Sequence, residues 1–313
     1  MLGHTKLLAV FVLNLYICST AWANGSLEQQ LRDVAAGGSV EQLDTLIAKG
    51  ANIDAPGKFG KRPLMFASES GSTDIVASLL SHGVEVNART KLGETALVLA
   101  VENNHPQIAA LLIELGANVH DRTRKGLDSL MIAAKNGNEI ITAQLLAFGA
   151  DVRSSDRNGN SALMHAVMLG HTAVVKTLFR YGSMVSPGLP NNAGLTPLMV
   201  AINRDREESV DVLLPKTRNL NFQDNFGAGT IHYAAEKNNL KVINYLVENR
   251  ADINLQDAEQ STPLMYAVRA GSIEAVKYLL ANGADKTIKN DTDQTAQQLS
   301  VETKKQAIID LFK

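Results

Sequence analysis

The chain has 313 residues, of which 45% are hydrophobic and 20% are charged, and its formal net charge at pH 7 is −2. This apolar content is sufficient for a folded core and excludes an intrinsically disordered chain. The near-neutral charge differs from the basic balance of nucleic-acid-binding proteins, so we expect no nucleic-acid partner.

The first predicted element is a cleavable signal peptide over residues 1–23. Lys6 supplies positive charge, residues 7–17 form an apolar run, and Ala21-Trp22-Ala23 offers small residues for cleavage after Ala23. The predicted location is therefore the periplasm, with secretion from the cell as the alternative.

Two other interpretations of this segment are weaker. A membrane anchor needs about 20 apolar residues, and residues 7–17 are too few, so we expect no stable membrane insertion. A lipoprotein signal would use Cys18, but Ile17 stands before it where a small residue is usual. Cleavage after Ala23 would remove Cys18, the only cysteine, and would exclude disulfides and cysteine chemistry from the mature protein.

After the signal segment, a leucine recurs with a period of 33 residues, broken by one step of 35. An apolar residue follows this leucine, and a glycine commonly stands four residues after it. The recurring positions are Leu46, Leu79, Leu112, Leu145, Leu178, Leu213, Leu246 and Leu279, with Phe312 in the same slot.

A second motif keeps the same period, in forms such as "TALVLA" from residue 95, "TPLMVA" from 196 and "TPLMYA" from 262. The combination of T-P-L-x-x-A with L-L-x-x-G-A at this period resembles the ankyrin repeat. The resemblance covers about residues 27–312. It implies an all-α repeat fold, an ankyrin solenoid of about nine helix-turn-helix units with projecting hairpins. It also implies a single array over residues 24–313, with caps near 27–55 and 288–313.

The local sequence agrees with these helix boundaries. Helix N-caps are predicted at Thr95, Asp128, Ser161, Thr196 and Thr262, and first-turn prolines at Pro63, Pro197 and Pro263. Two segments depart from the pattern: residues 183–194 hold a two-residue insertion, and residues 213–223 lack the usual Gly-Ala. A tolerated loop and a specificity loop both fit the insertion.

The sequence contains no recognisable catalytic or ligand-binding set. It shows no metal-binding histidine pair, phosphate-binding glycine loop or nucleophile motif, so we expect no enzyme activity, no cofactor and no metal site.

The resemblance implies a concave groove lined by the fourth residue after each helix start. These residues are apolar or aromatic with one exception, so we expect an exposed apolar stripe that binds a protein. The predicted groove residues are Phe66, Leu99, Ile132, His165, Val200, Tyr233 and Tyr266.

The predicted hairpin tips add a second surface, which is basic in the first half of the chain. Charge at exposed tips steers and orients a partner, so the pattern predicts a partner with an acidic patch. The predicted tip residues are Lys58, Phe59, Arg89, Lys91, Leu92, Arg122, Arg124, Lys125, Arg157 and Phe226.

These features favour a non-enzymatic, monomeric protein-binding module that acts outside the cytoplasm and masks or protects a partner protein. Three alternatives remain open from the sequence. One is an immunity protein against a toxin that reaches the periplasm, the second is a secreted effector that binds host proteins, and the third is an enzyme whose active site is assembled across units.

Overall fold

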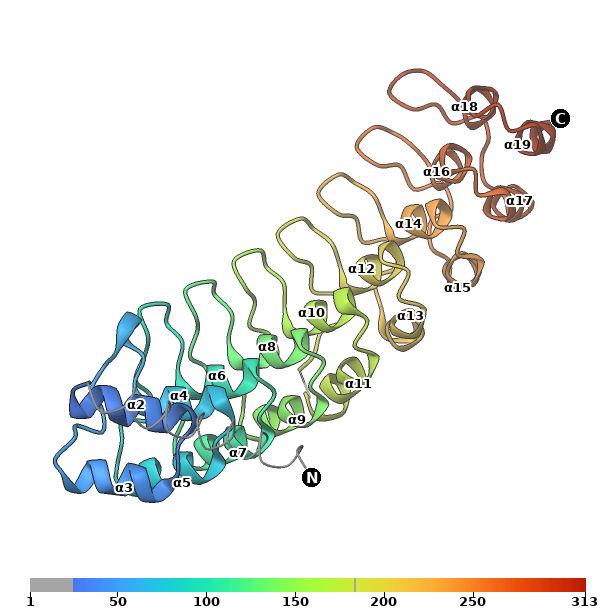
Figure 1. The fold of residues 1–313 in the computed structure, drawn as a ribbon. Coiled ribbons are helices and arrows are strands. Elements are labelled where there is room, and N and C mark those ends of the chain that lie inside the picture. The colour runs from blue at the N-terminus through green and yellow to red at the C-terminus, as the bar shows by residue number, and fades with distance from the viewer. Residues whose placement is uncertain (1–24, 183) are drawn as a thin grey trace, which may run out of the picture. The chain divides into compact units, whose positions relative to one another are not determined.

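A computed structural model describes residues 25–182 and 184–313. Within these ranges the chain forms nine successive helix pairs, and a loop projects between one pair and the next (Figure 1). The pairs are α2 (Leu27–Gly37) with α3 (Val40–Ala48), α4 (Pro63–Ser70) with α5 (Thr73–Ser81), α6 (Ala96–Glu102) with α7 (Pro106–Glu114), α8 (Ser129–Lys135) with α9 (Glu139–Ala147), α10 (Ala162–Leu169) with α11 (Thr172–Tyr181), α12 (Pro197–Asn203) with α13 (Glu207–Leu213), α14 (Thr230–Glu236) with α15 (Leu240–Glu248), α16 (Pro263–Ala270) with α17 (Ile273–Ala281), and α18 (Ala296–Glu302) with α19 (Gln306–Ile309).

Short 3₁₀ helices accompany three of these pairs, and named strands are absent from the described residues. They are η2 (Lys58–Gly60), η3 (Leu214–Lys216) and η4 (Asp310–Phe312). The predicted all-α repeat fold is therefore confirmed. The predicted signal peptide and its cleavage after Ala23 lie outside the described residues.

Contacts divide the chain into two compact units. The N-terminal unit comprises the described part of residues 1–133 together with 147–150, and the C-terminal unit comprises 134–146 and the described residues from 151 to 313. None of the helices in the described ranges has the length and apolar character needed to cross a bilayer.

The predicted N-caps form because a short polar side chain can accept from the orphan N–H groups of a helix start. Thr95 Oγ1 accepts from the N–H of Val98 at 3.3 Å, and Asp128 Oδ1 accepts from Met131 at 2.9 Å. The same bond is made by Ser161, Thr196 and Thr262. Pro63, Pro197 and Pro263 begin α4, α12 and α16.

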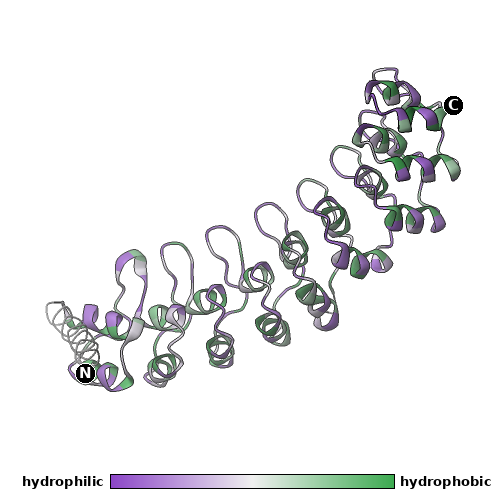
Figure 2. Cartoon of the chain, turned by 45° about the vertical axis from the view of Figure 1, so that its right-hand side comes forward, coloured by the Kyte–Doolittle hydropathy of each residue, from purple (hydrophilic) through white to green (hydrophobic). Residues whose placement is uncertain are grey.

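The leucine that recurs in each repeat lies in the hydrophobic core of both units. Leu79 and Leu112 in the N-terminal unit, and Leu145 and Leu246 in the C-terminal unit, are fully buried. In the N-terminal unit α4 packs against α2 and α6, and in the C-terminal unit α14 packs against α12 and α16. Figure 2 shows the hydrophobic colour concentrated in the helices, with the projecting loops mainly neutral or hydrophilic. Each repeat therefore buries its apolar face against its neighbours.

The projecting loops are hairpins that are hydrogen-bonded to one another. In the N-terminal unit the N–H of Lys91 donates to Phe59 O at 2.7 Å, and in the C-terminal unit the N–H of Ala258 donates to Phe226 O at 2.9 Å. Such close approach requires glycine at the turn. Gly227 has φ +80°, and a Cβ there would lie 2.6 Å from the backbone nitrogen of Ala258.

The irregular segments differ from their neighbours as the sequence predicts. Gly182, which precedes the insertion, has φ −91° and does not take the left-handed conformation that Gly149 adopts at φ +83°. Helix α13 continues directly into η3, and the hydroxyl of Thr217 donates to Leu213 O at 3.0 Å in place of a glycine cap.

Candidate functional site

The predicted groove row is not a continuous exposed stripe. Leu99, Ile132 and Val200 are only 4%, 2% and 6% exposed, which corrects the expectation that these residues offer an apolar surface. The cause is packing of the first helix of each repeat. In α6, for example, all residues from Ala96 to Val101 are buried, and α4 and α7 cover this helix.

The remaining row residues are partly exposed, and the side chains of three of them form a hydrogen bond. Phe66 in the N-terminal unit lies beneath the ammonium of Lys61, 4.6 Å from the ring centroid. His165, Tyr233 and Tyr266 in the C-terminal unit each contact an aspartate nine residues earlier in the chain. This part of the row is therefore a set of ordered polar pairs.

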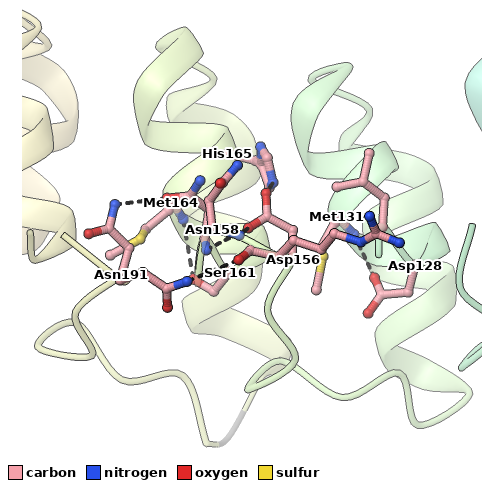
Figure 3. Close-up of polar contacts among 12 residues, drawn as sticks. Asp128, Met131, Asp156, Asn158, Ser161, Met164, His165 and Asn191 are labelled. Atoms are coloured by element: carbon pink, nitrogen blue, oxygen red, sulfur yellow. Dashed lines mark hydrogen bonds and ion pairs between the residues drawn. The ribbon is translucent and has the colours of Figure 1, made fainter. Parts of the chain in front are cut away.

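The first of these pairs joins His165 Nε2 to Asp156 Oδ2 at 3.1 Å (Figure 3). The other oxygen of Asp156 accepts from the N–H groups of Asn158 and Asn160, which closes the hairpin turn. In the same close-up Ser161 caps α10 through the N–H of Met164. His165 thus braces its own hairpin.

Tyr233 and Tyr266 repeat this arrangement two repeats and one repeat, respectively, before the last helix pair. The hydroxyl of Tyr233 donates to Asp224 Oδ2, and that of Tyr266 donates to Asp257 Oδ2 at 2.8 Å. Burial, and then the bond to the carboxylate, raises the pKa of both phenols well above the usual value, so both remain protonated donors at physiological pH.

His232 fixes the second ring. Its imidazole meets Tyr266 edge-on, with ring centroids 5.0 Å apart and an interplanar angle of 71°. His232 is fully buried, its Nδ1 accepts from Gly229 N at 2.9 Å, and its Nε2 lies 3.2 Å from Ser261 O. Burial lowers the pKa of this histidine, which favours its neutral form. The N–H of Gly229 donates to Nδ1, so the ring proton is on Nε2.

The two tyrosines line a cavity of about 370 Å³ in the C-terminal unit. Its walls are formed by the hairpins before α14 and α16 together with the tyrosines on those helices. The lining residues are Asp224, Phe226, Ala228, Tyr233, Asp257, Ala258, Glu259 and Tyr266. The two tyrosines and Phe226 are predicted from the sequence, but Asp224 and Asp257 are not, although an aspartate nine residues before a tyrosine or histidine recurs at 156, 224 and 257.

The hairpin tips of the N-terminal unit form a second surface, which we name the basic tip row: Lys58, Phe59, Lys91, Leu92, Arg124 and Lys125. All six side chains are exposed, with Phe59 at 60% and Leu92 at 51%. Backbone bonds hold successive tips together, since Arg124 N donates to Leu92 O at 2.8 Å.

The other predicted tip residues have different surroundings. Arg89 is paired with the buried carboxylate of Asp121, so its charge is compensated. Arg122 is exposed, and its backbone forms a bridge with Asp128. Arg157 and Phe226 are exposed tips of the C-terminal unit, and Phe226 is 74% exposed. Across the described ranges, His, Cys, Asp and Glu side chains form no group of three or more that could hold a metal ion.

Comparison with known proteins agrees with this architecture. A family model described as "Ankyrin repeats (3 copies)" matches residues 31–123, 130–224 and 207–290. Among solved structures, the ankyrin repeat domain of Bcl-3, a member of the IkappaB protein family, is similar with a TM-score of 0.62 and 24% sequence identity, over 70% of this chain and 98% of that chain. At this identity the likeness shows the fold alone. The sequence has no significant match among curated proteins.

Proposed function

Because the chain belongs to the ankyrin repeat family, whose repeats are generally protein-binding modules, we propose that it binds a partner protein outside the cytoplasm and masks or protects that partner without catalysis. The ankyrin repeat fold is a protein-interaction scaffold and is not typically enzymatic. The fold alone does not identify a partner, so the proposal depends on the exposed side chains that are particular to this chain.

The observation that carries the proposal is the basic tip row. Phe59 and Leu92 are large apolar side chains that remain more than half exposed, although the hairpins beneath them are fixed by backbone hydrogen bonds. A backbone that is already ordered loses little conformational entropy on binding, and exposed apolar side chains gain from burial in an interface. This row supports a protein-binding surface more strongly than the buried groove residues do.

The cations of the row support a partner with an acidic patch. Within the described residues, Lys91, Arg124 and Lys125 take part in no ion pair. Charges of this kind at a rim increase the association rate and orient the partner, and salt screens the effect. We therefore expect binding to weaken as ionic strength rises.

Action outside the cytoplasm rests on the features of residues 1–23. The charged start, the apolar run and Ala21-Trp22-Ala23 support export followed by cleavage after Ala23. The test is fractionation of a bacterium that expresses the full chain, with mass spectrometry of the recovered protein. A periplasmic form beginning at Asn24 is the expected result. An uncleaved protein that stays with the cytoplasmic fraction would contradict this part of the proposal.

Binding is tested by affinity capture from periplasmic extract at two salt concentrations. The parent protein is compared with a Phe59→Ser/Leu92→Ser variant and with a control that changes the exposed Leu115 to serine. We expect one protein to be retained by the parent and the control and lost by the double variant. Equal retention by all three proteins would place binding elsewhere. A partner found only among delivered toxins or host proteins would identify the immunity or effector role.

A further inference from the structure

The cavity between Tyr233 and Tyr266 presents hydrogen-bond acceptors only. Both phenol hydroxyls donate their hydrogen bond to an aspartate, so toward the cavity each phenol oxygen can only accept. The backbone N–H groups of the lining loop residues are also engaged inside the protein, at distances of 2.8–3.1 Å. These residues are Asp224, Phe226, Ala228, Asp257, Ala258 and Glu259.

The same cavity carries uncompensated negative charge. Asp224, Asp257 and Glu259 line it, and no lysine or arginine within the described ranges forms an ion pair with any of the three. An anionic ligand would therefore meet repulsion and would find no donor. A ligand that carries positive charge and several donors satisfies both features.

The remaining walls are aromatic, and the ring of Tyr266 is fixed in place. Tyr266 is held by Asp257 and by its edge contact with His232, and Phe226 stands at the loop tip with 74% of its surface exposed. Aromatic faces attract cations, and the attraction is largest for a weakly hydrated, planar cation that can stack on a ring.

We propose that this cavity binds the guanidinium group of an arginine side chain presented by the partner protein, with the apolar stem of that arginine against Phe226 and Ala258. A guanidinium has five donors, no acceptor and a permanent charge, and it matches carboxylates in a planar, bidentate manner. The inference rests on the proposed function, because it names the chemistry that the partner brings to the C-terminal unit.

The probe for this inference is the tripeptide acetyl-Leu-Arg-Leu-amide, titrated into the purified protein as the cell produces it, with tyrosine-ring NMR signals as the readout. A citrulline tripeptide has nearly the same shape but replaces the guanidinium by a neutral group that contains an acceptor oxygen. We expect saturable shifts of the Tyr233 and Tyr266 signals with the arginine peptide, and at least tenfold weaker binding of the citrulline peptide.

The chain itself offers a matched variant. Asn191 and Asn290 occupy the position of Asp257 in other repeats, and their Oδ1 atoms close the same hairpin turn, so Asp257→Asn removes charge while keeping the turn. We expect this variant to bind the arginine peptide at least fivefold more weakly. Asp156→Asn, the same change at a hairpin that does not line the cavity, should leave the affinity unchanged.

Besides the absence of arginine-peptide binding, three results would overturn the inference. They are equal binding of the arginine and citrulline peptides, binding of a lysine peptide as tight as that of arginine, and a dimer of the probe-free protein that Asp257→Asn converts to monomer, since a second copy would then be the occupant. If the arginine peptide fails to bind while Phe59→Ser/Leu92→Ser still abolishes partner capture, the proposed function is supported and the arginine site is rejected.

Discussion

The hairpins of the two units close the same turn with different side chains. In the N-terminal unit Thr90 Oγ1 accepts from the N–H groups of Leu92 and Glu94, both at 3.1 Å. In the C-terminal unit Asp224 Oδ1 accepts from Phe226 at 2.8 Å and from Ala228 at 3.0 Å. The backbone geometry is shared, but threonine has a single oxygen, whereas aspartate has a second oxygen that the turn leaves open.

That second oxygen explains why the two units offer different surfaces. In the C-terminal unit it accepts from a tyrosine nine residues later, and the resulting pairs wall an acidic, aromatic cavity. In the N-terminal unit the residue nine positions after Thr90 is the buried Leu99. The exposed charged side chains there are the cations of the basic tip row. The combination of the turn residue with the residue nine positions later thus distinguishes the covered aliphatic row from the open polar one.

The comparison implies that the units differ in their hairpins and not in their cores. Leu112 and Leu145 are both fully buried at the same repeat position, so Leu112→Ala and Leu145→Ala should each lower the free energy of unfolding by about 2–5 kcal/mol. Urea unfolding measures both changes. Leu115→Ala, which truncates an exposed side chain, is the control and should change stability by less than about 0.5 kcal/mol. A small loss at one site alone would show that one core is loosely packed.

Unlike the two core leucines, the two turn side chains should contribute unequally to the free energy of unfolding. Asp224 and Thr90 are each 7% exposed. Asp224→Ala should cost about 2–3 kcal/mol because it removes a charged acceptor of three hydrogen bonds, whereas Thr90→Ala should cost about 1 kcal/mol. Thermal unfolding of the two variants shows which substitution destabilises the protein more. Equal costs would mean that the bond to Tyr233 adds nothing to the stability of the hairpin.

The fold was readily predictable from sequence because its signals repeat. The leucine period locates the core, and residues such as Thr95 and Pro197 locate the helix starts, since caps and first-turn prolines act locally. Repetition of these local signals fixes the unit length, which fixes the architecture.

The site was less predictable because exposure depends on contacts between repeats. Leu99 and Tyr233 occupy the same repeat position, yet neighbouring helices bury the first, while the second stays half-buried beside a carboxylate. Sequence alone gave both the same groove role. The sequence feature that distinguishes the polar positions is an aspartate nine residues before the row residue, as Asp224 and Asp257 are before Tyr233 and Tyr266. Similarly, Arg89 counts as a tip cation in sequence, but it is paired with Asp121.

A smaller effect concerns pH and only the C-terminal unit. His232 occupies the position that Met131, Met199 and Met265 fill in other repeats, and burial lowers its pKa below the usual value of about 6.5. The unfolded state therefore binds more protons below about pH 6.5, so stability should fall as pH falls, by at most about 1.4 kcal/mol per pH unit. Urea midpoints between pH 7.5 and 5 measure the slope. His232→Met should reduce that slope, and an unchanged slope would assign it to other groups.

The smallest expected effect on stability lies at the tips. Leu92→Ser and Phe226→Ser should each change the free energy of unfolding by less than about 0.5 kcal/mol, because 51% and 74% of these side chains are already in contact with solvent. Their effects on binding should separate the units. Leu92→Ser should weaken capture of the acidic partner and leave the arginine peptide unaffected, whereas Phe226→Ser should weaken the arginine peptide by removing one wall of its cavity. A variant that weakened both interactions while remaining folded would show that the two surfaces do not act independently.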